Sequence, residues 1–167
     1  INLNIFVHGK GKDDDVTRGS LSAPFIKKGN GLTADFGYNS RIFGKWQVDL
    51  GTHIENKDYL EFTERSTNVS TGIRYFPTDD LRFYLRLSHK KTNDWFIWRS
   101  DNHYATYQSK NTTIKLNMRW YPDDRQELQV KLEAVAFRNQ DGKGWTADST
   151  GYLSSLGTAE TSINSGR

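Results

Sequence analysis

The side chains of this 167-residue chain that are best suited to acid–base or metal chemistry are its four histidines: His8, His53, His89 and His103. No two of them have the His-x-x-x-His spacing that brings metal ligands together. Ser88 precedes His89, but neighbouring residues of a strand point to opposite faces, so they cannot form a nucleophile–base pair. The aspartate run 13–15 lacks the Gly and terminal Glu spacing of an EF-hand loop. We therefore expect no enzymatic activity, no metal site and no cofactor.

A second chemical feature is a set of aromatic side chains interspersed with carboxylates and amides: Trp95, Trp98, Tyr104 and Tyr107. Such rings suit sugar binding, because an amphipathic ring packs on the apolar face of a pyranose while polar neighbours bind its hydroxyls. The same rings also anchor proteins at a membrane interface. We expect this segment, about 91–110, to be an exposed loop. It then either binds a glycan or anchors the protein.

Charged residues form the third feature, because they recur at alternate positions of the expected strands. The basic ones are Arg74, Arg82, Arg86, Lys115, Arg119 and Lys131. Continuing the alternation into two earlier strands places three acidic residues on the same face: Asp35, Asp49 and Glu55. Opposite charges on neighbouring strands attract. A narrow interior would hold them as an ion-pair lattice, whereas a wide one would expose a basic wall that favours anions.

A strand–turn–strand unit that occurs twice positions many of these charges. Its copies cover residues 69–87 and 114–134. Each copy alternates apolar and polar residues, reaches Arg and two aromatics, turns at Pro77 or Pro122 with two Asp, and alternates again. Period-two alternation indicates strands with one apolar and one polar face. Both a soluble sheet with one wet face and a transmembrane barrel with a polar lumen fit this pattern.

Eight strands are expected, over residues 1–9, 32–41, 46–55, two within 67–90, two within about 110–137, and 152–159. Their connections alternate between long and short, and strands of about ten residues suit a tilted membrane span. Aromatic residues gather at the short-turn end, as at a membrane interface: Phe43, Trp46, Tyr75, Phe76, Trp120 and Tyr121. The apolar positions expected to face lipid are Ile1, Leu3, Ile5, Val7, Val69, Ile73, Leu81, Phe83, Leu85, Leu116, Met118, Leu128, Val130 and Leu132. Antiparallel order puts the turns at Pro77 and Pro122 on one, periplasmic side, and the segments near Asp13, Phe62, Trp98 and Gly142 on the other.

Composition narrows the class of protein. Lys and Arg number 23 against 20 Asp and Glu, and a net charge of +3 is too small to indicate a nucleic-acid partner. The chain contains no Cys, and no apolar run approaches the roughly 18 residues of a membrane helix. Mean hydropathy is low, at −0.78, which is compatible with a barrel because only alternate residues of its strands face lipid.

The stretches 94–102, 118–122 and 126–132 carry a family resemblance. Between Asp94 and Phe137 the sequence resembles the C-terminal barrel of large bacterial outer-membrane proteins whose N-terminal part is similar to a family-9 carbohydrate-binding module. The resemblance implies an outer-membrane location and a carbohydrate-related role, and it implies no catalytic residue. Barrels of that group end with further strands rich in Arg, Tyr and Leu, which this sequence lacks.

The sequence thus predicts one all-β domain over residues 1–167: an antiparallel transmembrane β-barrel of about eight strands, part of a larger barrel. We expect a fragment of a longer chain whose edge strands pair with the rest of that chain or with partner subunits. The expected role is non-enzymatic and porin-like, in transport, surface binding or assembly at the bacterial outer membrane. Expected partners are membrane lipid or lipopolysaccharide and a glycan. The alternatives are a soluble β-sandwich carbohydrate-binding module and an outer-membrane hydrolase.

Overall fold

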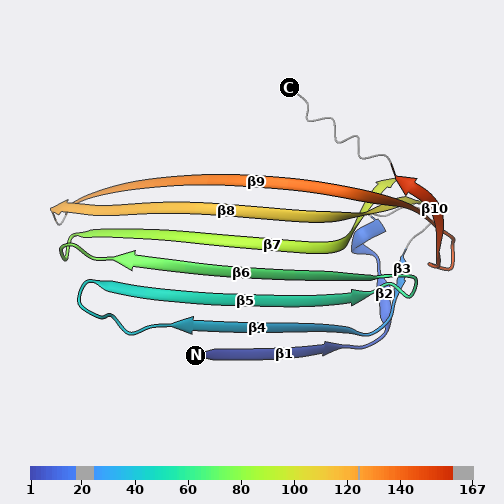
Figure 1. The fold of residues 1–167 in the computed structure, drawn as a ribbon, viewed down its shortest axis with the longest axis horizontal. Helices are drawn as coiled ribbons and strands as arrows, with labels where there is room; N and C mark the ends of the chain where they lie inside the picture. The colour runs from blue at the N-terminus through green and yellow to red at the C-terminus, as the bar shows by residue number, and fades with distance from the viewer. Residues whose placement is uncertain (18–24, 124, 160–167) are drawn as a thin grey trace, which may run out of the picture.

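A computed structural model of the chain describes residues 1–17, 25–123 and 125–159. Its main feature is one eight-stranded antiparallel sheet in which the strands follow one another in chain order (Figure 1). The strands are β1 (Asn2–His8), β4 (Gly31–Asn39), β5 (Trp46–Asp58), β6 (Thr63–Tyr75), β7 (Leu81–Ser100), β8 (His103–Asp123), β9 (Gln126–Ala147) and β10 (Leu153–Ala159). The prediction of an all-β, antiparallel fold is confirmed.

A small second unit lies at one end of the sheet. It consists of the strand pair β2 (Gly11–Asp13) and β3 (Ile26–Lys28) and a single 3₁₀ turn, η1 (Asp15–Thr17). Figure 1 shows this unit and β10 at one end and the turns after β4, β6 and β8 at the other. The turns at Pro77 and Pro122 therefore lie at one end of the sheet, and the connections near Asp13, Phe62 and Trp98 at the other, as predicted. In the part of the chain that the structure describes, no helix is long and apolar enough to span a membrane.

Strand length differs from the prediction. β7, β8 and β9 contain 20, 21 and 22 residues, about twice the expected length. The expected aromatic loop is wrong, because β7 and β8 continue through it to a tight turn at Asp101. The expected loop near Gly142 is also wrong, since Gly142 lies within β9 and pairs with Ala159. The continuity of β7 and β8 has a local reason: residues 81–121 contain no Gly or Pro, and the aromatic residues there favour strands.

The sheet is open over the described residues, and no closed barrel is formed. β1 is one edge, and no described strand pairs with its outer side. At the other edge β10 pairs only with the Gly142–Ala147 end of β9, so the rest of β9 has a free edge. The described residues therefore form one open antiparallel sheet and do not show the closure of the barrel expected from the sequence.

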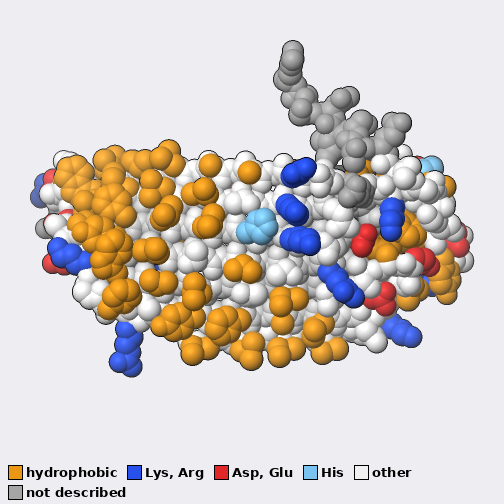
Figure 2. Space-filling model, in the orientation of Figure 1, with side chains coloured by type: hydrophobic (Ala, Val, Ile, Leu, Met, Phe, Trp, Pro, Cys, Tyr) orange, Lys and Arg blue, Asp and Glu red, His pale blue; other side chains and the backbone are white. Residues whose placement is uncertain are grey.

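The register fixes which side chains share a face, because directly paired residues of antiparallel strands point to the same side. Ile73, Leu85, Leu116 and Leu132 form one row across β6 to β9. All four are exposed, by 42%, 47%, 38% and 60% respectively. Figure 2 shows hydrophobic side chains covering the left and central parts of one face of the molecule. We call this surface the apolar face and the opposite one the polar face.

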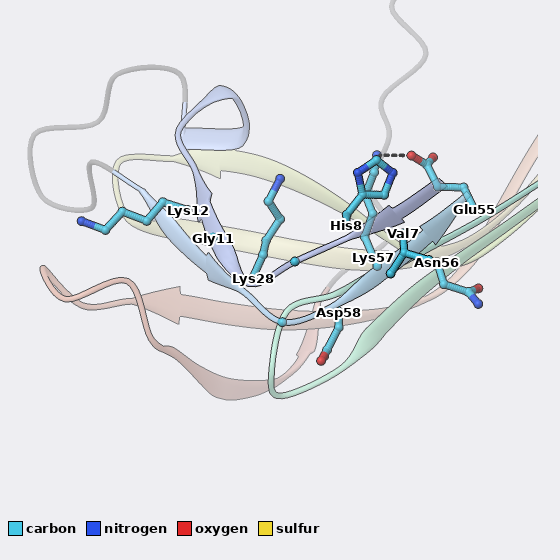
Figure 3. Close-up of a pocket in the computed structure, with 12 residues that line it drawn as sticks. Val7, His8, Gly11, Lys12, Lys28, Glu55, Asn56, Lys57 and Asp58 are labelled. Atoms are coloured by element: carbon cyan, nitrogen blue, oxygen red, sulfur yellow. Dashed lines mark ion pairs between the residues drawn. The ribbon is translucent and has the colours of Figure 1, made fainter. Parts of the chain in front are cut away.

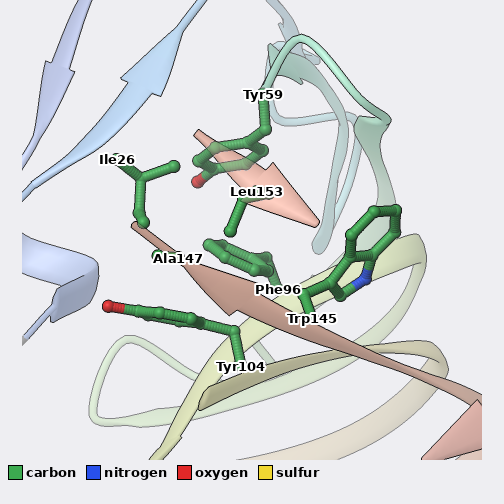
Figure 4. Close-up of a cluster of buried hydrophobic side chains, with 7 residues drawn as sticks. All are labelled: Ile26, Tyr59, Phe96, Tyr104, Trp145, Ala147 and Leu153. Atoms are coloured by element: carbon green, nitrogen blue, oxygen red, sulfur yellow. The ribbon is translucent and has the colours of Figure 1, made fainter. Parts of the chain in front are cut away.

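Buried hydrophobic residues are concentrated at one end of the sheet (Figure 4). The cluster consists of Ile26, Tyr59, Phe96, Tyr104, Trp145, Ala147 and Leu153. Its rings pack closely: the ring centroids of Phe96 and Tyr104 are 5.1 Å apart, and those of Tyr59 and Phe96 are 4.8 Å apart. Along most of its length, by contrast, the sheet is a single layer with side chains exposed on both faces. The apolar face is thus left uncovered by the described residues.

Candidate functional site

The polar face is the surface on which the predicted charges meet. The register places all nine predicted residues on it, in rows that cross the strands. One row pairs Arg74 with Tyr84, Tyr84 with Asn117 and Asn117 with Lys131. The next row contains Asp49, Gly72, Arg86, Lys115 and Glu133. A third contains Arg82, Arg119 and Gln129.

Asp49 is the most buried charge of this face, with 8% of its surface exposed. Its Oδ1 lies 3.4 Å from Nη1 of Arg74, and the hydroxyl of Tyr84 donates to its Oδ2 over 3.3 Å. The guanidinium of Arg74 also lies over the ring of Tyr84, 4.7 Å from its centroid. Gly72 makes this arrangement possible, because a Cβ at that position would come within 2.5 Å of the Asp49 carboxylate.

Other carboxylates neutralise part of the remaining basic charge. Lys115 pairs with Glu133 at 3.0 Å, and Nε of Arg119 with Glu127 at 3.1 Å. Arg86 donates to the hydroxyl of Ser70 over 2.9 Å. Arg82 and Lys131 have no carboxylate within ion-pair distance among the described residues. The predicted lattice is thus only partly neutralised by ion pairs among the described residues, and at the turn end Asp79, Asp80 and Asp123 line a hollow together with Arg82.

Two shallow hollows lie among the basic residues of the polar face. One, of about 330 Å³, is lined mainly by Arg74, Arg82, Tyr84, Asn117 and Arg119. The other, of about 390 Å³, is lined by Tyr84, Arg86, Ser88, Thr113 and Lys115. Both hollows combine basic and hydroxyl donors with apolar surface, which in the first includes the rings of Phe76 and Phe83. Their donors can bind an anion or a hydroxyl group beside an apolar contact.

The two remaining predicted acids of the polar face also have basic partners. Asp35 contacts Nδ1 of His53 at 2.6 Å, and Glu55 pairs with Lys57 at 3.4 Å. His8, His89 and His103 lie on separate strands or turns. Within the described ranges, no group of three or more His, Asp or Glu side chains is placed to hold a metal ion.

The predicted aromatic ring at the turn end is divided between the two faces. Trp46 stacks on Tyr75 at 4.2 Å between ring centroids, in a row of the apolar face that also includes Phe83. Residues that point to the apolar face are called outward below. Phe43 and Trp120 are exposed. Phe76 and Tyr121 are corrections: Phe76 lines a hollow of the polar face, and the Tyr121 hydroxyl accepts from Nη1 of Arg119 over 3.5 Å.

Two of the four predicted aromatic ligand contacts are buried, and the other two are partly exposed. Tyr104 and Tyr107 are only 2% and 1% exposed, so they cannot form an exposed sugar-binding platform. Arg99 donates to the Tyr107 hydroxyl over 2.9 Å. Trp95 lies edge-on to the ring of Phe137 and is half-buried, and Trp98 packs against the buried cluster. Tyr104 is part of that cluster, because the extended β7 and β8 bring it under the β2–β3 unit (Figure 4).

A pocket that the sequence did not predict lies between the β2–β3 unit and the sheet (Figure 3). It has a volume of about 550 Å³, and its charged lining residues are His8, Lys12, Lys28, Glu55, Lys57 and Asp58. Two ion pairs stabilise its walls: Lys57 with Glu55, drawn in Figure 3, and Lys28 with Asp13 at 3.0 Å. Asp13, from the aspartate run, thus joins β2 to β3. Strands of three residues leave no periodic signal, so the sequence could not indicate this pocket.

Two buried titratable groups lie near the aromatic cluster. Burial raises the pKa of the Glu64 carboxyl, although the backbone N–H of Phe96 donates to its Oε2 over 3.0 Å and opposes the rise. Burial and the nearby Glu64 carboxylate raise the pKa of the Tyr59 hydroxyl. The Tyr59 hydroxyl donates to Asp13 over 3.4 Å. Tyr59 thus joins the sheet to the β2–β3 unit, and Glu64 joins β6 to β7. Among the described residues their surroundings contain no nucleophile–base–orienter arrangement.

Comparison with known proteins adds no relative: no family model, no curated protein and no solved structure matches this chain.

Proposed function

We propose that this chain forms part of the wall of a bacterial outer-membrane β-barrel, with a non-enzymatic role in transport, surface binding or assembly. The observation that supports this most is the uncovered apolar face of a single-layer sheet. Exposed apolar residues occupy successive outward rows, such as Val69, Leu87 and Ile114, and the described residues provide no second layer above them. Water disfavours so large a contiguous apolar surface, whereas hydrocarbon accommodates it.

On the apolar face, apolar residues give way to polar ones along a line that is oblique to the rows of paired residues. This oblique border also supports a membrane position. On β5 the outward residue Ile54 is apolar, but its row continues through Thr67 to Lys91 on β7. On β1 and β4 the apolar outward residues extend farther still, to Val7 and Leu32. The border therefore crosses the hydrogen-bonded rows obliquely. This is the geometry expected when strands cross a bilayer at a tilt, because the membrane plane is then inclined to the rows.

The height of the apolar face agrees with a bilayer. On β9 the outward residues run from Leu128 to Ala136 before Arg138 interrupts them. The interval from residue 128 to 138 corresponds to about 34 Å of strand, and to about 26 Å of depth at a tilt of about 40°. Transmembrane barrels carry an outward apolar band about 25 Å tall.

The polar face would then line the interior of the barrel. Arg82 and Lys131 have no carboxylate partner in the described part of the chain, and with their partly neutralised neighbours they favour anions or hydroxyl-rich solutes over cations. The resemblance of residues 94–137 to barrels linked with carbohydrate-binding modules suggests a carbohydrate-related solute. Trp95 and Trp98, which remain partly exposed, are the aromatic residues still available for a glycan.

Adjacent residues on opposite faces of β8 provide the test. The chain has no Cys, so Leu116→Cys and Lys115→Cys each introduce a single thiol for labelling. In the full-length protein incubated with phospholipid vesicles, a fluorophore at position 116 should be quenched by brominated lipid, and one at position 115 should be quenched by aqueous iodide. If both fluorophores respond only to iodide, the apolar face meets no lipid and the soluble carbohydrate-binding alternative is favoured.

A further inference from the structure

Three basic residues lie side by side on the apolar face, at its border. Lys91 on β7 pairs with Lys110 on β8, and Lys110 pairs with Arg138 on β9. All three are exposed. We call them the basic row. Figure 2 shows Lys and Arg side chains forming a column that adjoins the hydrophobic area.

Like charges that are directly opposite on neighbouring strands repel, so such a row needs compensation. None of the ion pairs among the described residues includes Lys91, Lys110 or Arg138. On the polar face, by contrast, Lys115 and Arg119 each have a carboxylate partner. The basic row thus has no carboxylate partner among the described residues and is open to an anion from outside them.

The position of the basic row indicates what that charge is. The row next to it contains His89, Thr112 and Ala136, and the row after that contains Leu87, Ile114 and Ala134. One mixed row, in which His89 contacts the Thr112 hydroxyl, thus separates the cationic residues from the first wholly apolar row. At this boundary, Lys and Arg keep their stems in the hydrocarbon and extend their charged heads to the lipid phosphates.

We propose that the basic row binds the phosphate groups of anionic lipids in the leaflet at the β2–β3 end of the sheet. This inference rests on the proposed membrane position and adds a defined lipid contact to it. Neighbouring strands are about 4.8 Å apart, so three cations spaced across β7, β8 and β9 extend over roughly 10 Å, about the width of a lipid headgroup. Arg65, also exposed and outward on β6, extends the basic border to one side.

The opposite border of the apolar face provides an internal comparison. There the outward residues are Leu81, Trp120 and Leu128, which form one row without a charge. Amphipathic rings rather than cations mark that boundary. The lipid preference should therefore be confined to one end of the sheet.

A site-specific quenching experiment measures this preference. Fluorophores are attached to Thr112→Cys, in the row beside the basic row, and to Val130→Cys, near the opposite border. The full-length protein is placed in vesicles of equal phosphatidylcholine and phosphatidylglycerol, with bromine on one lipid at a time. At position 112 we expect phosphatidylglycerol to be preferred by at least about fivefold, the factor that one Lys or Arg contributes at an anionic surface. At position 130 we expect equal quenching.

Two triple variants then test whether the basic row causes the preference for phosphatidylglycerol. K91Q/K110Q/R138Q should abolish it at position 112, whereas K90Q/K115Q/K131Q removes three charges from the polar face and should leave it intact. The inference fails if both lipids quench equally at position 112, if both variants behave alike, or if millimolar inorganic phosphate removes the preference. Quenching by both lipids without a preference leaves the membrane position standing. Absence of quenching by either lipid refutes the membrane position and the inference together.

Discussion

Replacing Leu116 with Arg is expected to cost about 2–4 kcal/mol of folding free energy in a bilayer. Leu116 is an outward residue of β8, between Leu85 and Leu132 in its row. It lies six residues from Lys110 along β8, which is about 20 Å of strand and about 16 Å of depth at a 40° tilt. In an apolar band about 25 Å tall that position is close to the midplane, where an Arg is most costly.

Reversible unfolding of the full-length protein in phospholipid vesicles, followed in denaturant, gives the free energy. Two control substitutions separate the effect of membrane depth from the effect of the face of the sheet. Ala136→Arg is one row from the basic row and should cost about 0–1 kcal/mol. Val135→Arg also replaces an apolar residue, but it points to the polar face beside Thr113 and should be similarly mild. Equal costs at Leu116 and Ala136, or the same cost at Leu116 without lipid, would refute the reasoning, because a soluble core does not grade by membrane depth.

Three further predictions concern other parts of the molecule. Gly72→Ala should destabilise by about 1–2 kcal/mol, because its Cβ would displace the Asp49 carboxylate from Arg74, whereas Gly51→Ala, which meets only the rotatable Ser70 hydroxyl, should be near neutral in the same denaturant assay. The raised pKa of Glu64 means that the folded state holds this proton more tightly than the unfolded state, so stability should fall as pH rises from the ordinary glutamate pKa through the raised one. Glu64→Gln still accepts from the Phe96 N–H and should remove that fall, which unfolding at a series of pH values measures; an unchanged slope would contradict it. Finally, Asn4→Cys combined with single cysteines over positions 129–137 should form no disulfide within one chain, and efficient intramolecular bonding of β1 to β9 would show that the sheet closes on itself.

The faces of the sheet could be predicted from the sequence alone. Arg74 and Ile73, or Arg86 and Leu85, alternate strictly, and in a strand this alternation determines the side to which each points. That inference needs no tertiary information, which is why the charged rows and the apolar rows agree with the register. Alternation along a strand does not predict the pairing of Asp49 with Arg74, because two residues 25 positions apart meet only through the register of β5 and β6.

In the aromatic segment, composition and continuity predict different structures. The composition, with Trp95, Trp98, Tyr104 and Tyr107 among polar residues, favours a ligand-binding loop. The absence of Gly and Pro from residue 81 to residue 121 indicated uninterrupted strands. Their burial could not be read locally either, since it depends on the β2–β3 unit, which contributes Ile26 to the cluster from a distant part of the chain.

The edges of the sheet at β1 and β9 are unpaired among the described residues, and a position in the membrane requires strands that pair with them. Soluble sheets protect an edge strand with charges, proline, a bulge or a cover. β1 has none of these among its seven residues, Asn2–His8: only its last residue is titratable, and its register with β4 is regular. An unpaired edge within hydrocarbon is costly, since its N–H and C=O groups find no water. We therefore infer that strands from the rest of a longer chain, or from partner subunits, pair with β1 and with the free length of β9. The polar face of this sheet would then line an interior that it shares with the strands that complete the barrel.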